Sequence, residues 1–409
     1  MEHLLIQNIG LLATPEGHSA RAGAQQGEIR LQKDAWILIE DGKILATGSR
    51  RTPDAEEVSV LDAGGRLVTP GLVDAHTHLI FGGWRQNELE KKLHGASYLD
   101  ILAEGGGILS TVRATRQAPE QTLYERGRTA LAQMLRLGVT TVEAKSGYGL
   151  DLETELKMLR VIRRLDQTQP ISLAATYLGA HAMPEEYTQD RAGYIRLICQ
   201  TVLPAVREEQ LAEFCDVFCE TGAFTVTESE QILLRAQSLG LKLKVHADEI
   251  DAIGASELAG RLGAVSAEHL IVCRASGIEA LRAGGSVACC LPATSLYLGA
   301  DFAPARSMLD AGVPVALASD FNPGSCPSLN LQLVMNLACL RYRLTPEQAL
   351  TGVTLNAAAA ICRAGQIGSI EPGKAADLTL WDAQDLAYIF YRMGSNLVSG
   401  VVKQGRPVF

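Results

Sequence analysis

The segment GLVDAHTHLIFGG, residues 71–83, places two histidines one residue apart inside an apolar run. Side chains at positions i and i+2 of an extended strand leave the same face. His76 and His78 therefore share a face, and Asp74 lies on it too. Such a pair is either packed in the core or part of a binding site, and the rest of the chain has to decide which.

The bulk composition is that of a soluble globular protein. The chain has 409 residues, of which 47% are apolar and 20% charged. A single core usually stops growing at about 250–300 residues, so we expect one large domain and a smaller companion. The net charge is 37 − 46 = −9, and no local basic cluster stands out. This charge argues against a nucleic-acid-binding protein.

The N-terminus and the cysteines favour a cytoplasmic protein. The opening residues MEHLLIQNIG lack a basic region followed by an apolar core, which a secretory signal would need. No apolar run approaches the ~20 residues that span a bilayer. The nine cysteines include no Cys-x-x-Cys pair, which indicates reduced, mostly buried thiols.

Both ends of the chain are rich in predicted strands. In AWILIEDGKILATG, residues 35–48, two apolar runs flank Asp41-Gly42, a dipeptide that favours a type I′ hairpin turn. The segment IGSIEPGKAADLTLWD, residues 367–382, has the same texture. We predict a small β-sandwich domain built from residues 1–66 and 366–409.

The middle of the chain, residues 67–365, alternates strand-like runs with amphipathic helical stretches. The predicted strands lie in eight runs: 67–79, 139–149, 171–181, 215–224, 241–250, 264–270, 286–295 and 313–324. Eight strand–helix units in a row indicate an α/β fold of the (β/α)₈, or TIM, barrel type. No Gly-x-Gly-x-x-Gly follows the first strand, so a dinucleotide-binding fold has no support.

Five of the eight histidines fall at the carboxyl ends of predicted strands. They are His76, His78, His181, His246 and His269, and Asp320 ends the eighth strand. We interpret His3, His18 and His94 as surface or structural residues. A single histidine is more often structural, but the carboxyl ends of barrel strands converge, and buried unpaired imidazoles cost free energy. The pattern predicts a metal centre.

The ligand set we infer is His76, His78, His246 and Asp320, completed by water. Zinc and iron both accept imidazole and carboxylate ligands, so the choice between them stays open. A bound metal lowers the pKa of its water and makes hydroxide available as a nucleophile. Glu249 is a candidate for proton transfer, unless it is a solvated loop acid. His269 is a candidate for holding the water or the oxyanion, and the general base stays open among Glu249, His269 and Asp320.

These residues resemble the pattern of the amidohydrolase superfamily, and the resemblance covers essentially the whole chain. The segment GKAADLTLWD is similar to the C-terminal β segment of its members. Many members hold two metals bridged by a carboxylated lysine at a barrel strand end. Here the run 215–224 has no lysine, and Lys145 belongs to the second strand, so we expect a single zinc or iron ion per subunit.

Finer motifs resemble one branch of that superfamily. They are HTHLIFGGWRQNEL, EAKSGYGL, TYLGAHAMP, HADEI, AEHL and ASDFNPGSCPS. That branch hydrolyses the cyclic amide of 4-imidazolone-5-propanoate to N-formimidoyl-L-glutamate in histidine degradation. The resemblance implies a homodimer. It also implies contacts to substrate or product from Arg85, Tyr148, His181, Glu249, Asn322, Gly324 and Ser325.

The chemistry of these residues agrees with that substrate, although alternatives stay open. A propionate carboxylate suits an arginine fork with a tyrosine hydroxyl beside it, and His181 could polarise the ring carbonyl. Alternatively, Arg85 pairs only with Glu88 or Glu90, and Tyr148 and His181 are structural. A deaminase acting on a purine- or pyrimidine-like ring is the alternative function. A catalytically silent scaffold is disfavoured because every ligand and both Glu249 and His269 are present.

Overall fold

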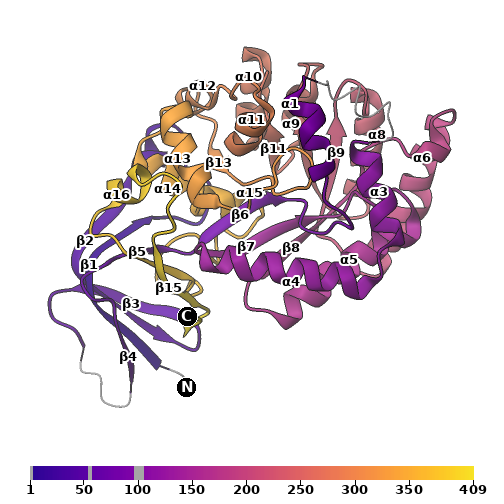
Figure 1. The fold of residues 1–409 in the computed structure, drawn as a ribbon. Helices are drawn as coiled ribbons and strands as arrows, with labels where there is room; N and C mark the ends of the chain where they lie inside the picture. Colours follow the sequence, from indigo (N-terminus) through magenta and orange to yellow (C-terminus); the bar gives the residue numbers. More distant parts are fainter. Residues whose placement is uncertain (1–2, 54–57, 96–105) are drawn as a thin grey trace.

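The computed structural model describes residues 3–53, 58–95 and 106–409. Two sheets organise these residues, one from the middle of the chain and one from its two ends (Figure 1). All nine cysteines lie in the described part and are free thiols, as predicted. Among the described helices, none has the length and apolar character needed to cross a membrane.

The middle of the chain forms eight parallel strands in sequential order, which confirms the predicted α/β barrel. They are β6 (Leu72–Thr77), β7 (Val139–Lys145), β8 (Ser172–Ala180), β9 (Phe214–Cys219), β10 (Lys242–Ala247), β11 (Ser266–His269), β12 (Val287–Cys290) and β13 (Val315–Leu317). The residues after β13 close the ring onto β6. The backbone N–H of His78 donates to the carbonyl of Phe321 at 2.9 Å, and that of Asp320 donates to His76 at 3.0 Å.

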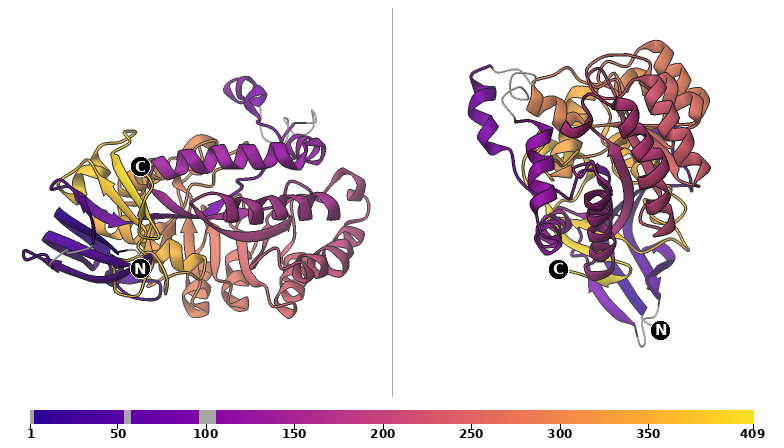
Figure 2. Two further views of the ribbon diagram at one scale, coloured as in Figure 1. Left: turned by 90° about the horizontal axis from the view of Figure 1, so that it is seen from below. Right: turned by 90° about the vertical axis from the view of Figure 1, so that its right-hand side faces the viewer.

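Amphipathic helices surround the barrel and bury their apolar stripes against it (Figures 1 and 2). The helix α5, for example, begins where the Asp151 carboxylate accepts from the backbone N–H of Thr154 at 2.7 Å. The helices that follow the barrel strands are α1 (Leu89–Leu93), α3 (Ile108–Gln117), α4 (Glu120–Arg136), α5 (Leu152–Thr168), α6 (Arg191–Leu197), α7 (Leu203–Glu208), α8 (Val226–Ser238), α9 (Ala255–Leu262), α10 (Ala275–Gly284), α11 (Pro292–Leu298), α12 (Ala305–Asp310), α13 (Leu331–Tyr342), α14 (Pro346–Gly352) and α15 (Leu355–Ala360). A further helix, α16 (Leu386–Tyr391), follows a strand of the second sheet.

The two ends of the chain share a mixed sheet at one end of the molecule, where indigo and yellow strands lie together (Figure 2). Its strands are β1 (His3–Pro15), β2 (Ile29–Glu40), β3 (Lys43–Ser49), β4 (Ser59–Asp62), β5 (Leu67–Pro70), β14 (Leu378–Trp381), β15 (Val398–Lys403) and β16 (Arg406–Pro407). The strands β2 and β3 form the predicted hairpin, with φ of 47° at Asp41 and 78° at Gly42. Hydrogen bonds join these strands into a single sheet. Buried apolar side chains of this part of the molecule form a core of their own.

The apolar run 67–79 divides between the two sheets at Gly71. Its first part, β5, pairs with β1 and β14 in the terminal sheet, and its second part, β6, opens the barrel. A Cβ at Gly71 would overlap the side chain of Thr140 on β7, so only glycine allows the chain to pass there. The predicted domain boundaries at residues 66 and 366 stay predictions.

Candidate metal centre and active site

The carboxyl end of the barrel gathers the predicted metal ligands in one buried cluster. His76 lies in β6 and His78 directly after it, while His246 lies in β10 and Asp320 follows β13. None of these four residues is more than 3% exposed. Asp74, on the same strand as His76, does not join them, because its carboxylate accepts from the backbone N–H of Ser319 at 2.9 Å and from its hydroxyl at 2.5 Å.

The ligand atoms in this cluster have the spacing of a metal shell. Oδ1 of Asp320 lies 3.4 Å from Nε2 of His76 and 3.5 Å from Nε2 of His78. Nε2 of His78 lies 3.4 Å from Nε2 of His246. Ligands bound tetrahedrally to one ion at about 2.0–2.1 Å are themselves roughly 3.3 Å apart. Among the described residues, Nε2 of His76 and Oδ1 of Asp320 have no hydrogen-bond partner, so the donor set fits a divalent metal.

His269 is a second candidate for this shell. It forms a group with His76 and His246 whose ligand atoms all lie within 4.8 Å of one another. Burial lowers the pKa of His76, His78 and His269 well below the usual histidine value, with smaller contributions from neighbouring positive charges. The imidazoles are therefore neutral at pH 7, which metal binding requires.

Two buried carboxylates orient the histidines of the cluster. Nδ1 of His76 donates to Glu268 at 2.7 Å, and Nδ1 of His246 lies 2.9 Å from Oδ2 of Asp216 as an ion-pair contact. Because Nδ1 of each ring faces a carboxylate, Nε2 of each ring is directed into the cluster. Burial alone would raise the pKa of Glu268, but Lys244 and other nearby groups lower it to about 2. Both carboxylates are ionised at neutral pH, since His246 and Lys145 also lower the pKa of Asp216.

Glu249 lies at the edge of the cluster beside His269. The distance from Oε2 of Glu249 to Nε2 of His269 is 3.5 Å, and the Glu249 side chain is 14% exposed. Burial, followed by the charges of Asp320 and Glu220, raises the pKa of Glu249 to about 8. The alternative of a solvated loop acid therefore does not match its surroundings. Glu220 holds the loop, because its carboxylate accepts from the backbone N–H of Glu249 at 3.1 Å.

Two of the site residues have left-handed backbone conformations. The φ angle is 69° at His269 and 56° at Asp320. Such angles are uncommon for residues other than glycine and cluster at functional sites, where the surrounding structure maintains them. The ring closure between Asp320 and His76 supplies that support for Asp320.

His181 and Tyr148 form one wall of the site. The His181 ring stacks on His78 with centroids 4.8 Å apart, and the Tyr148 ring lies 5.2 Å from His181. Nδ1 of His181 donates to the carbonyl of Gly147 at 2.9 Å, because a carbonyl can only accept. Glu155 fixes this loop by accepting from the backbone N–H of Gly149 at 2.8 Å. The structure thus brings both predicted substrate residues to the metal cluster.

Arg85 pairs with Glu88, as one of the two alternatives predicted. Its Nε lies 3.1 Å from both carboxylate oxygens, and Nη2 lies 3.0 Å from Oε2. The same guanidinium also reaches the loop after β13, where a Cβ on Gly324 would overlap Nη1 of Arg85. The ion pair therefore orients Arg85 toward that loop.

Asn322 and Ser325 shape the same loop. The Asn322 side chain accepts from the backbone N–H groups of Gly324 and Ser325 at 2.8 and 2.7 Å and donates to the carbonyl of Asp320 at 2.8 Å. These bonds connect the predicted product-binding residues to Asp320, a predicted metal ligand. The loop is therefore connected to Asp320 directly, through the side chain of Asn322.

Comparisons with known proteins identify the family. Residues 67–408 match the model of the amidohydrolase family. The imidazolonepropionase of Alkaliphilus metalliredigens is 49% identical over 100% of this chain and 98% of its own length. That of Bacillus velezensis is 48% identical over 99% of this chain and 96% of its own. The chain belongs to the imidazolonepropionase branch of the amidohydrolase family.

Solved structures support the same fold for this imidazolonepropionase-family chain. Atrazine chlorohydrolase from Arthrobacter aurescens, complexed with zinc, matches with a TM-score of 0.74 at 20% identity, over 99% of this chain and 95% of its own. An adenosine deaminase from Xanthomonas campestris with bound zinc matches with a TM-score of 0.71 at 20% identity, over 99% and 92%. At this identity the likeness concerns the fold alone.

The residues that the sequence analysis missed in this imidazolonepropionase-family site are Asp216, Glu268 and two buried lysines, Lys145 and Lys244. All four are fully buried within barrel strands. A charged residue inside an otherwise apolar strand is rarely buried without a partner, and this was the available signal. Their partners lie far away in the sequence and could not be read from it.

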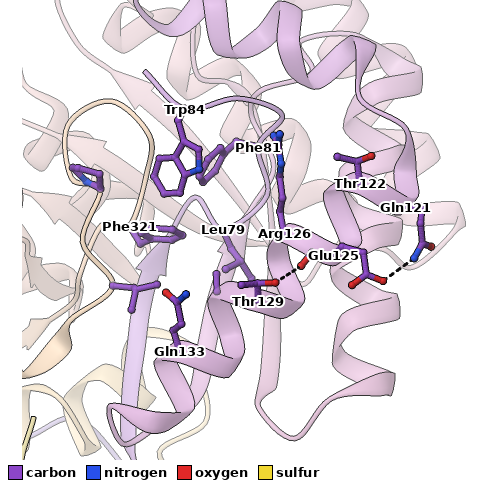
Figure 3. Close-up of a pocket in the computed structure, with 13 residues that line it drawn as sticks. Leu79, Phe81, Trp84, Gln121, Thr122, Glu125, Arg126, Thr129, Gln133 and Phe321 are labelled. Atoms are coloured by element: carbon purple, nitrogen blue, oxygen red, sulfur yellow. Dashed lines mark hydrogen bonds between the residues drawn. The ribbon is translucent and has the colours of Figure 1, made fainter. Parts of the chain in front are cut away.

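A separate cavity of about 540 Å³ lies beside the site, between α4 and the loops after β6 and β13 (Figure 3). Leu79, Phe81, Trp84 and Phe321 form one wall, and polar side chains of α4, including Gln133, face them. None of the clustered ligands lines it. Phe321 and Phe81 lie between the cavity and the site: the carbonyl of Phe321 accepts from the backbone N–H of His78, and the Phe81 ring lies 6.5 Å from that of Tyr148.

Proposed function

We propose that this protein hydrolyses the cyclic amide of 4-imidazolone-5-propanoate to N-formimidoyl-L-glutamate, using one zinc or iron ion per subunit. One observation carries the proposal. The same end of one barrel holds a cluster of neutral histidines with a carboxylate, together with Glu249 and the Arg85 side chain. Membership of the imidazolonepropionase branch agrees with it.

The residues that would hold the ion are His76, His78, His246 and Asp320, with His269 adjacent. A divalent ion bound there lowers the pKa of a water and polarises a carbonyl. The single ion is supported by β9, which offers no lysine for a carboxylated bridge. Lys145 itself is engaged by Asp216 and Glu143 at 2.8 Å each.

Glu249 is the best-placed group for moving the proton. In its ionised form it would take a proton from the attacking water, whose oxygen bonds to the ring carbonyl carbon, and then deliver it to the departing ring nitrogen as the C–N bond breaks. Asp320 is less available, because Oδ2 accepts from Thr294 at 2.7 Å and Oδ1 faces the histidines. His269 is neutral and stands beside Glu249 near the developing oxyanion.

His181 and Arg85 would position the substrate. Burial, then the His246 charge, lowers the pKa of His181 to about 3, so Nε2 is an acceptor at neutral pH. This favours a bond from a ring N–H of the substrate over the predicted polarisation of its carbonyl. Nη1 of Arg85, beside Gly324, would bind the propionate carboxylate, with the Tyr148 hydroxyl assisting.

The experiment that tests this function follows the ultraviolet absorbance of freshly generated 4-imidazolone-5-propanoate with the metal-loaded protein, and identifies the product by mass spectrometry. Formation of N-formimidoyl-L-glutamate, lost on chelation and restored by Zn²⁺ or Fe²⁺, is the expected result. No turnover with metal bound, together with ammonia release from a purine or pyrimidine, would overturn it. The homodimer and the cytoplasmic location stay predictions, and light scattering after gel filtration tests the first.

A further inference from the structure

Two lysines lie inside the barrel beneath the histidine cluster. They are Lys145 on β7 and Lys244 on β10, and both are completely buried. A buried ammonium group is unfavourable unless opposite charges and hydrogen-bond acceptors surround it. Neither lysine belongs to the clustered ligands, so the reaction proposed above does not account for their presence.

Lys145 contacts Asp216, which in turn contacts His246 of the cluster. Its Nζ lies 2.8 Å from Oδ2 of Asp216 and 2.8 Å from Oε1 of Glu143. The same Oδ2 is 2.9 Å from Nδ1 of His246, and Oδ1 accepts from the His246 backbone N–H at 3.2 Å. Asp216 thus accepts from Lys145 on one side and contacts the ring and the backbone of His246 on the other.

Lys244 stands in the same relation to Glu268. Its Nζ lies 3.2 Å from Oε1 of Glu268 and donates to the carbonyl of Ala360 at 3.1 Å. The other oxygen, Oε2, accepts from Nδ1 of His76 at 2.7 Å. Two series of contacts therefore lead to the cluster from different strands, each running from a lysine through a carboxylate to a histidine.

We propose that Lys145 and Lys244 are positioning residues that act through Asp216 and Glu268 to present Nε2 of His246 and His76 to the metal. An ammonium group only donates, so it holds each carboxylate as an acceptor facing the histidine Nδ1–H. That bond selects the tautomer with the lone pair on Nε2. Removing the lysine leaves a buried carboxylate with one strong donor fewer and with freedom to turn away from its histidine.

The inference rests on the metal site of the proposed function, so its test measures binding of Zn²⁺ alone and not turnover. Competition with a chromophoric chelator gives the zinc Kd of the wild-type protein, Lys145→Met and Lys244→Met. Loss of an outer-shell partner weakens metal binding by roughly 10- to 100-fold, and we expect this range for both variants.

Lys374→Met is the matched control. Lys374 is also a buried lysine, and its Nζ donates hydrogen bonds to Gly17, Ala364 and Ser369. It contacts neither Asp216 nor Glu268 in these bonds. Its replacement removes a buried charge and lowers the thermal midpoint, and we expect the zinc Kd to stay within about twofold of wild type because no contact leads from it to a ligand histidine.

A double-variant cycle tests whether Lys145 acts through Asp216. In an Asp216→Asn background, Lys145→Met should weaken zinc binding by much less than it does alone, because coupled residues are not additive. Fully additive losses would overturn the proposed route.

Histidine ¹⁵N spectra of the metal-free wild-type protein provide a readout that needs no variant to fold. His76 and His246 should both appear as the Nδ1–H tautomer, and the Nε2–H form at either would overturn the inference. A wild-type protein that binds neither Zn²⁺ nor Fe²⁺ would instead contradict the proposed function. Normal zinc affinity in both lysine variants would contradict the lysine proposal alone.

Discussion

The imidazole of His181 lies stacked on that of His78, with ring centroids 4.8 Å apart and planes inclined by 14°. His78 faces Asp320 through Nε2, whereas His181 uses Nδ1 to bond the carbonyl of Gly147. The stack therefore joins a proposed metal ligand to a ring whose remaining nitrogen, Nε2, is available to a substrate.

Replacing His181 by phenylalanine separates stacking from hydrogen bonding. The ring remains against His78, but the Nε2 acceptor is lost, and a buried substrate donor left unpaired costs about 1–3 kcal/mol. We expect kcat/KM to fall roughly 5- to 100-fold with unchanged metal content, measured by steady-state kinetics and metal analysis. Unimpaired kinetics would restrict His181 to stacking.

Substitutions at Arg85 and Gly324 should have the same effect on substrate binding. Arg85→Ala removes the proposed partner of the propionate, and Gly324→Ala displaces it, since a Cβ there would overlap Nη1 of Arg85. A charge-assisted hydrogen bond is worth about 1.5–3 kcal/mol, so KM should rise roughly 10- to 100-fold in both variants.

The control for this prediction is Gly365→Ala, where an added Cβ has no neighbour within 4 Å. We expect its KM to match wild type. A substrate analogue without the propionate should be converted equally by wild type, Arg85→Ala and Gly324→Ala. Equal losses on both substrates would contradict recognition of the carboxylate.

Glu249→Gln should abolish most turnover without releasing the metal. The amide keeps the size of the carboxylate but cannot carry a proton, and loss of a general acid–base group lowers kcat by roughly 10²–10⁴-fold. Zinc affinity should be unchanged, because Glu249 approaches His269 at 3.5 Å and is not among the clustered ligands. Substantial remaining activity in a fully metallated variant would shift the proton-transfer role to Asp320 or His269.

Metal removal should lower the stability of the protein. A ligand that binds only the folded state adds about 2.7 kcal/mol at a free concentration of 100 Kd. The thermal midpoint of chelator-treated protein should therefore rise with added Zn²⁺ in a concentration-dependent way. His246→Ala removes one ligand atom from the cluster and should weaken this response strongly. An equal zinc response in that variant would place the ion elsewhere.

The sequence by itself determined the eight-strand order, the β2–β3 hairpin and the positions of the clustered ligands. These features depend on local patterns. Apolar runs separated by amphipathic helices specify barrel units, and Asp41-Gly42 allows the positive φ of a tight turn. The alternation of a strand puts His76 and His78 on one face, and the carboxyl ends of parallel strands bring them to His246 and Asp320.

Only the tertiary structure decided how side chains choose their partners. Arg85 pairs with Glu88 and also reaches Gly324, far along the chain. His76 bonds Glu268 across 192 residues, and Lys145 bonds Asp216 across 71. The apolar run 67–79 divides at Gly71, where Thr140 leaves no room for a side chain. Such partners are set by strand register and close packing between distant segments, which local propensity does not encode.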